Sequence, residues 1–394
     1  MRRLESSPPE HYDERPRRRR SAASIVAIAT ALILAILLIA SPWFWAFVGD
    51  IAGTKRAYDK GAKLSIRRTI HFTVTGQGSI DYEMDVPVPK NLLDSESAYV
   101  QRSIKTDPSP TPLDDYKYGQ HWLVWEGSDI TSQEIAVDYE LEVRTVVWHI
   151  SSGESADVDA IPQEAKDAHL GTEWKIDPTL PEIVALSAQL TRLDDNVRDK
   201  LRSIYDYMGA NMVYETGRSG VPKDCLETLH DKAGDCDDQS ILFCSLARAA
   251  GIPAWMEFGA LYDPGLDVWG GHAWAKAYVP LVDGGGGAVC VDVVNKEFFV
   301  RACNRFADWE SDGNGTHMED YYTTLSYRSA QSVHLDYSET YTGSYEATGG
   351  KVRMILGNSM QPVFSISTAD AQQIITGKTD ASDHLSRSKH QIDL

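Results

Sequence analysis

The chain has only five cysteines among its 394 residues, and their number is odd. Five thiols cannot all pair inside one monomer, so a disulfide framework is not expected. No close-spaced pair of metal ligands, such as CxxC or HxxxH, accompanies Cys236, the cysteine at the start of a predicted helix. We therefore expect neither a zinc site nor another cofactor. Buried thiols are expected at Cys225, Cys244, Cys290 and Cys303.

Positive charge is also scarce. The formal net charge is −19, with 38 Lys and Arg against 57 Asp and Glu. Residues 1–20 hold seven Arg against four acidic residues, about +3, which leaves about −22 for the remainder. A polyanionic body of this kind argues against nucleic acid as a partner. The length and the apolar content of 42% suit two folded units.

Charge of either sign is absent from Ser21 to Gly49. This run exceeds the roughly 20 apolar residues that cross a bilayer, and it is longer than the roughly 7–15 residues of a signal-peptide core. We expect an uncleaved transmembrane anchor at 21–48 rather than a buried core helix. The basic tail at 1–20 predicts a cytoplasmic N-terminus, so this is a single-pass protein with an extracytoplasmic body.

Residues 64–150 alternate between apolar and polar side chains. The apolar members form runs at Ile70–Val74, Ile80–Val88 and Ile135–Val143, and an aromatic strand covers His121–Trp125. This period of two predicts an antiparallel β-sandwich domain, in which the first two runs form a hairpin about the Gly76–Ser79 turn. Because no catalytic constellation falls here, a binding or spacer module is the default interpretation.

Helical spacing follows a polar stretch at 151–181. One helix is expected over Val197–Met208, capped by Asn196 or Asp195. These patterns predict a second domain at 180–330 in an α+β chain, preceded by the β-sandwich. Residues 331–394 are rich in Ser, Thr, Gly and Asp, so we expect a β or extended segment, including Lys351–Gly357, and a disordered tail from about Gly377.

The stretch GDCDDQS places Cys236 in the first turn of a predicted helix, after a cap at Asp235. Unpaired backbone N–H groups and the positive end of the helix dipole favour a thiolate there. Asp237 and Asp238 act in the opposite sense, but their directions, about 100° and 200° around the helix, should take them away from the sulfur. The helix terminus alone is not sufficient, so we expect a base nearby.

Two strands joined by a Gly-rich loop supply that base. Alternation over Gly270–Asn295 places apolar side chains on one face, with His272 and Asp292 on the other. If the hairpin is centred near Val282, His272 lies directly opposite Asp292, with Cβ atoms about 4.5–5.5 Å apart. The carboxylate can then orient the imidazole and leave its other nitrogen for Cys236.

The order Cys, His, Asp in AGDCDDQSILFCSLARAAGIPA, GGHAWAKAYVP and CVDVVN, with RACNRFADW after the acid, resembles the transglutaminase-like superfamily. The resemblance covers about Glu182–Tyr327 and implies a papain-like transglutaminase core. It implies Cys236 as nucleophile, His272 as general base and acid, and Asp292 as the residue that orients the histidine. Members of this superfamily make or break amide bonds. No calcium-binding pattern of acidic loop residues is matched, so no calcium requirement is implied.

Two departures from the family pattern bear on substrate preference. Val293 follows the acid where many relatives have proline, and Trp255 stands where a basic residue is common. Neither departure removes a member of the Cys-His-Asp set.

Three functions fit these features. The first is a membrane-anchored extracytoplasmic cysteine enzyme that forms a thioester with a protein or peptide substrate and then hydrolyses or transfers the acyl group. The second is a catalytically silent binding or scaffold protein that uses the β-sandwich. The third is a metal-bound structural domain. Because no member of the Cys-His-Asp set is missing, the sequence favours the first.

Overall fold

The computed structural model describes residues 55–93, 99–215, 221–355 and 391–393. The described residues between Arg56 and Met354 belong to one compact unit. Among the described residues, no helix is both long enough and apolar enough to cross a bilayer. The basic tail expected at 1–20, the anchor expected at 21–48 and most of the tail expected after Gly377 lie outside the described residues.

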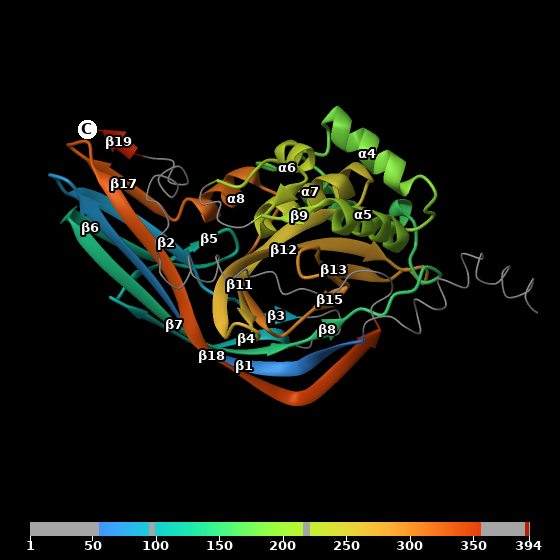
Figure 1. Ribbon diagram of the computed structural model, residues 1–394, viewed down its shortest axis with the longest axis horizontal. Coiled ribbons are helices and arrows are strands. Elements are labelled where there is room, and N and C mark those ends of the chain that lie inside the picture. Colours follow the sequence, from blue (N-terminus) through green and yellow to red (C-terminus); the bar gives the residue numbers. More distant parts are fainter. Residues whose placement is uncertain (1–54, 94–98, 216–220, 356–390, 394) are drawn as a thin grey trace, which may run out of the picture. The chain divides into compact units, whose positions relative to one another are not determined.

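Two five-stranded sheets share one apolar core (Figure 1). Their strand orders are β18-β1-β7-β4-β3 and β19-β17-β2-β6-β5, and nearly all the pairing is antiparallel. The strands are β1 (Lys55–Thr75), β2 (Ile80–Pro87), β3 (Leu92–Leu93), β4 (Tyr99–Ser109), β5 (Leu113–Lys117), β6 (Gln120–Ile130), β7 (Ser132–Arg144), β17 (Leu325–Ser329), β18 (His334–Ile355) and β19 (Gln391–Asp393). Strands β17 and β18 follow the helical region in sequence, so both sheets contain strands from outside 64–150.

Alternation correctly predicted the buried face of these strands but not their neighbours. Apolar residues at every second position of β2 and β7 are buried. The expected hairpin of the first two runs is wrong, because β1 pairs with β7 whereas β2 pairs with β6. The Gly76–Ser79 connection therefore crosses from one sheet to the other, where Phe72 meets Tyr82 edge to face with centroids 4.9 Å apart. A period of two fixes the side-chain face and leaves the pairing partner open.

A third sheet, of order β14-β13-β12-β11-β16, is built from the segment between β8 and β17. Helices cover one of its faces (Figure 1). Its strands are β11 (Ala254–Asp263), β12 (Val268–Pro280), β13 (Gly286–Asp292), β14 (Glu297–Phe298) and β16 (Arg305–Glu310). The short strands β8 (Val146–Val147), β9 (Val213–Tyr214), β10 (Ala233–Gly234) and β15 (Val300–Arg301) form two small additional sheets.

The helices are η1 (Val158–Ala160), α3 (Gln163–His169), α4 (Pro181–Thr191), α5 (Val197–Asn211), α6 (Cys225–Asp231), α7 (Cys236–Ala249) and α8 (Gly315–Tyr322). Asn196 caps α5 by accepting a hydrogen bond from the N–H of Asp199, as predicted. Nearly every side chain of α7 after its first turn is buried, and the helix packs on β11 and β12. The chain therefore has a mixed α/β fold, in which α7 lies at the centre of the helical core.

Candidate active site

Cys236 is the first residue of α7, directly after the cap at Asp235. The Asp235 side chain accepts hydrogen bonds from the N–H groups of Asp237 and Asp238, and the Asp238 side chain accepts one from the Asp235 N–H. A Cβ atom at Gly234 would lie 2.5 Å from the Asp238 Cβ, so glycine is required there. This cap fixes where the helix begins and hence where the thiol projects.

The Cys236 side chain is partly exposed, whereas the other four thiols are buried, and all five are free. The backbone N–H of Ala273 donates a hydrogen bond to the Cys236 sulfur, which brings the thiol next to β12. Asp237 Oδ1 lies 4.0 Å from the sulfur, so the expectation that this carboxylate points away is wrong. Asp238 does turn away, into the cap and toward the N–H of Lys223.

Burial raises the pKa of the Cys236 thiol well above its usual range, and the carboxylates of Asp237 and Asp235 raise it further. The Ala273 hydrogen bond opposes this rise. Desolvation and the neighbouring carboxylates therefore favour the protonated thiol over the thiolate. A neighbouring base is needed to take the proton.

His272 and Asp292 lie in contact, with Nε2 of the histidine 2.7 Å from Oδ2 of the aspartate. The predicted register was wrong by two residues, because Ala275 of β12 pairs with Val291 of β13. A shift of two keeps each side chain on the same face, so the residues meet diagonally rather than directly across the ladder. Both are buried, at 5% and 1% exposure, since this second face of the sheet is also covered.

Asn295 also belongs to this cluster, although it was not singled out from the sequence. Its Nδ2 lies 2.8 Å from Asp292 Oδ2 and 2.9 Å from His272 Nε2. Its backbone N–H donates to Asp292 Oδ1 at 2.8 Å. Its position three residues after the acid, at the end of CVDVVN, was the available signal. Asn295 thereby helps to fix the Asp292 carboxylate.

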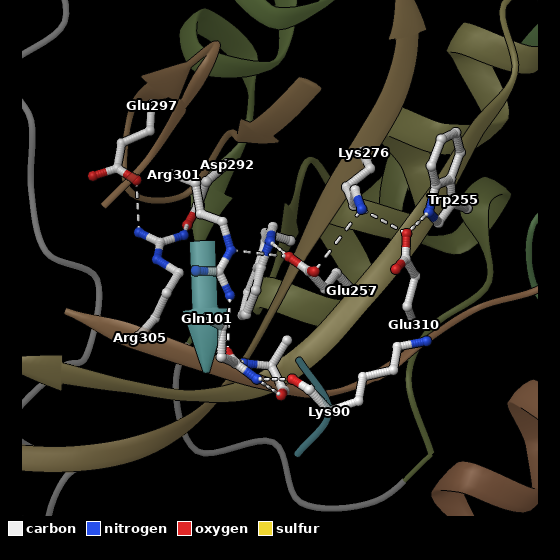
Figure 2. Close-up of polar contacts among 12 residues, drawn as sticks. Lys90, Gln101, Trp255, Glu257, Lys276, Asp292, Glu297, Arg301, Arg305 and Glu310 are labelled. Carbon is white, nitrogen blue, oxygen red and sulfur yellow. Dashed lines mark hydrogen bonds and ion pairs between the residues drawn. The ribbon is translucent and has the colours of Figure 1, made fainter. Parts of the chain in front are cut away.

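Arg305 of β16 also binds the Asp292 carboxylate (Figure 2). Its NH1 lies 2.7 Å from Asp292 Oδ2, and its NH2 lies 2.6 Å from Glu297 Oε2. Burial alone would raise the pKa of Asp292, but His272 and Arg305 hold that pKa well below its usual range. Asp292 is therefore ionised and can orient a base without taking its proton.

A second set of buried polar residues includes Glu257, Arg301 and Gln101 (Figure 2). The Trp274 ring stacks on His272 with centroids 5.7 Å apart, and Trp274 Nε1 donates to Glu257 Oε2 at 2.5 Å. Glu257 in turn lies 3.4 Å from Arg301 Nε, and Arg301 NH2 lies 3.2 Å from Gln101 Oε1. Because Gln101 belongs to β4, this network links the first sheet to the Trp274 ring that stacks on His272.

The described ranges contain no cluster of three or more His, Cys, Asp or Glu side chains that could hold a metal ion. The partly exposed thiol of Cys236 lies at the N-terminus of α7. It contacts the backbone of β12, the strand that carries His272, and His272 is paired with Asp292 of β13. This arrangement is suited to acyl transfer by a cysteine nucleophile.

Residues 184–288 match the sequence profile of the transglutaminase-like superfamily. The uncharacterized protein YebA of Bacillus subtilis strain 168 is 32% identical over 123 residues, which cover 26% of this chain and 16% of that relative. A solved structure from Cytophaga hutchinsonii, provisionally described as a cysteine protease, has a TM-score of 0.52 at 16% identity and covers 79% of this chain and 96% of its own. The periplasmic domain of TgpA from Pseudomonas aeruginosa has a TM-score of 0.31 at 16% identity, covering 63% of this chain and 90% of its own.

Proposed function

We propose that this protein is a cysteine enzyme that acts on amide bonds of proteins or peptides, because residues 184–288 match the transglutaminase-like superfamily. In this proposal Cys236 is the nucleophile, His272 is the general base and acid, and Asp292 orients His272. The observation that carries it is the His272–Asp292 hydrogen bond of 2.7 Å on the strand whose Ala273 N–H touches the Cys236 sulfur.

The reaction begins when the Cys236 sulfur attacks the amide carbonyl while its proton passes to His272. Nε2 of the ring is engaged by Asp292, so Nδ1 is the atom that accepts the proton. The tetrahedral intermediate collapses with loss of an amine protonated by His272, and a thioester remains. Water or a second amine then attacks the thioester, which gives hydrolysis or acyl transfer.

The developing oxyanion needs a donor near the sulfur. Asp235 uses its side chain and carbonyl to bind the N–H groups of Asp237, Asp238 and Gln239. We assign the oxyanion to the Cys236 N–H, which stands at the start of the same helical turn.

We also propose that the enzyme is held to a membrane by residues 21–48 and acts outside the cytoplasm. Support comes from the charge-free run Ser21–Gly49, preceded by the arginines of Arg15–Arg20. This part of the proposal is independent of the chemistry at Cys236.

Turnover of glutamine-containing peptides tests the chemistry. The purified full-length protein, incubated with and without a primary amine, should release ammonia or form an amine adduct. Cys236→Ala and His272→Ala should each lose nearly all activity, since the nucleophile and its proton acceptor have no substitute. Cys244→Ala is the matched control, because Cys244 is a buried thiol of the same helix and should leave most activity intact. Near-normal turnover by folded His272→Ala would refute this mechanism.

A further inference from the structure

Arg305 is completely buried beside the His272–Asp292 pair and holds two carboxylates at once. Its guanidinium contacts Asp292 at 2.7 Å and Glu297 at 2.6 Å, and both acidic side chains are at most 1% exposed. Desolvation of three charges is unfavourable, and their close mutual attraction helps to offset it, together with the hydrogen bonds that Asn295 donates to Asp292. With both carboxylates ionised, the three groups form one buried unit with a net charge of about −1.

His272 and Arg305 bind the same oxygen atom. Asp292 Oδ2 lies 2.7 Å from His272 Nε2 and 2.7 Å from Arg305 NH1. The positive charge of Arg305 therefore opposes the stabilisation that Asp292 offers to a protonated His272. If Glu297 carried no charge, Asp292 and Arg305 would cancel, and a buried imidazolium would have no net counter-charge from this unit.

We propose that Glu297 and Arg305 are positioning residues that set the proton affinity of His272. The inference rests on the proposed function of His272 as the base for Cys236. Arg305 holds the Asp292 oxygen at the ring nitrogen, and Glu297 compensates the charge of Arg305. The charge of Asp292 then remains available at the moment when the S–H bond of Cys236 breaks and the proton reaches His272 Nδ1.

Other charged or titratable groups face the same cluster from neighbouring elements. They are Cys236 and Asp237 of α7, Tyr205 of α5, Cys290 of β13, Lys296 between β13 and β14, Glu257 of β11, and Arg301, whose guanidinium lies 5.7 Å from the centroid of the Trp274 ring that stacks on His272. These groups are chemically the same in the parent and in every variant of Glu297 or Arg305. Differences between such variants therefore report the charge of the buried unit.

A purely structural role for the ion pair makes a different prediction. As a structural element, the pair would lose stability when either partner is removed, and the titration of His272 would not move in a direction set by charge. As a charge-compensating unit, the pair predicts that the two single substitutions shift the His272 pKa in opposite directions. The double substitution, which removes one charge of each sign, should largely cancel them.

The experiment is an NMR titration of His272 in full-length protein carrying ¹³C-labelled histidine, with Cys236→Ala throughout so that the thiol does not titrate. The His272 signal is identified, among the 11 histidines of the chain, by its loss in His272→Gln. We expect Glu297→Gln to lower the His272 pKa by about one unit, because it removes a negative charge. We expect Arg305→Met to raise the His272 pKa, because it removes a positive charge. Glu297→Gln with Arg305→Met should return the pKa close to that of the parent.

The matched control is Glu173→Gln, which neutralises another fully buried carboxylate, paired with Arg248 at 2.6 Å, and should leave the His272 titration unchanged. Either single variant tests the sign of the shift, so the experiment survives if the other fails to fold. Equal pKa values in all folded variants, or shifts of the same sign in both singles, would overturn the proposal. Since the titration needs no turnover, its failure is distinct from failure of the proposed enzyme activity.

Discussion

The backbone N–H of Ala273 donates a hydrogen bond to the sulfur of Cys236, and Ala273 directly follows His272 in β12. The start of α7 and the strand that carries His272 are therefore held together by a main-chain contact. Because a backbone donor does not depend on side-chain rotamers, substitution of His272 should leave the thiol where it is. Variants at the base can thus be interpreted as chemical changes.

Alkylation of Cys236 should be slow near neutral pH and should rise with pH. Its raised pKa means that little thiolate is present at neutral pH, and the thiolate is the reactive form. Iodoacetamide labelling over a pH series from about 6 to about 10, followed by peptide mass spectrometry, measures this dependence. Cys236 should still react before the four buried thiols, because it alone among the cysteines is partly exposed. A rate that is already maximal below neutral pH would contradict the raised pKa.

Substitution of Asp292 by Asn should preserve most of the fold and remove most of the activity. An amide at this position can present its NH₂ group to His272 and so favour the wrong tautomer. In the Ser-His-Asp triad of serine proteases, the equivalent change lowers kcat about 10⁴-fold. Steady-state kinetics together with a thermal melt checks this expectation. A small loss of rate, below about tenfold, in a well-folded variant would show that Asp292 does not orient the base.

Asp308 should make the protein less stable as the pH rises. Burial raises the pKa of Asp308 to about 7, and Arg68 opposes this only in part, since it lies 3.4 Å from Asp308 but 2.7 Å from Glu339. The unfolded chain has an Asp pKa of about 3.9, so the folded state binds more protons between about pH 4 and pH 7. The free energy of unfolding therefore falls as pH rises through that window.

Asp308→Asn should remove this pH dependence. The free energy of unfolding of the variant minus that of the parent should therefore be higher at about pH 8 than at about pH 5, by on the order of 2 kcal/mol. Urea unfolding of the parent and the variant at about pH 5 and about pH 8 provides the comparison. The difference between the two proteins should grow with pH. A difference that is constant across this range would show that Asp308 does not titrate there.

Protease added to intact cells should degrade the body of the protein and spare an N-terminal tag. The arginines of Arg15–Arg20 precede the charge-free run, which favours a cytoplasmic N-terminus. Immunoblotting for the tag and for the body, with lysed cells as the control, distinguishes the two sides. Protection of the body until lysis would reverse the proposed orientation.

Local chemistry explains why parts of the site were predictable from sequence. An Asp followed three residues later by another Asp, after Gly234, is enough to set the start of α7 and hence the position of Cys236. Alternation was enough to put His272 and Asp292 on one face. Their actual pairing was not predictable, because a loop with four consecutive glycines allows more than one register.

Arg305 and Glu297 were missed for a different reason. They come from β16 and β14, on opposite edges of the five-stranded sheet, and only the folded sheet brings their side chains together. A charged residue on a short strand ordinarily indicates a solvent-facing position. Here the second face of the sheet is buried, so the same residue forms an internal ion pair.

The two sandwich sheets cannot be completed early during synthesis on the ribosome, because each takes a strand, β17 or β18, from beyond the helical region. Strand β1 lies between β7 and β18 in its sheet, so one edge of β1 stays open until His334–Ile355 has been translated. Contacts over such a large sequence separation form slowly. A chain truncated before Leu325 would expose the open edges of β1 and β2 and should aggregate, even though every residue of the proposed active site is present.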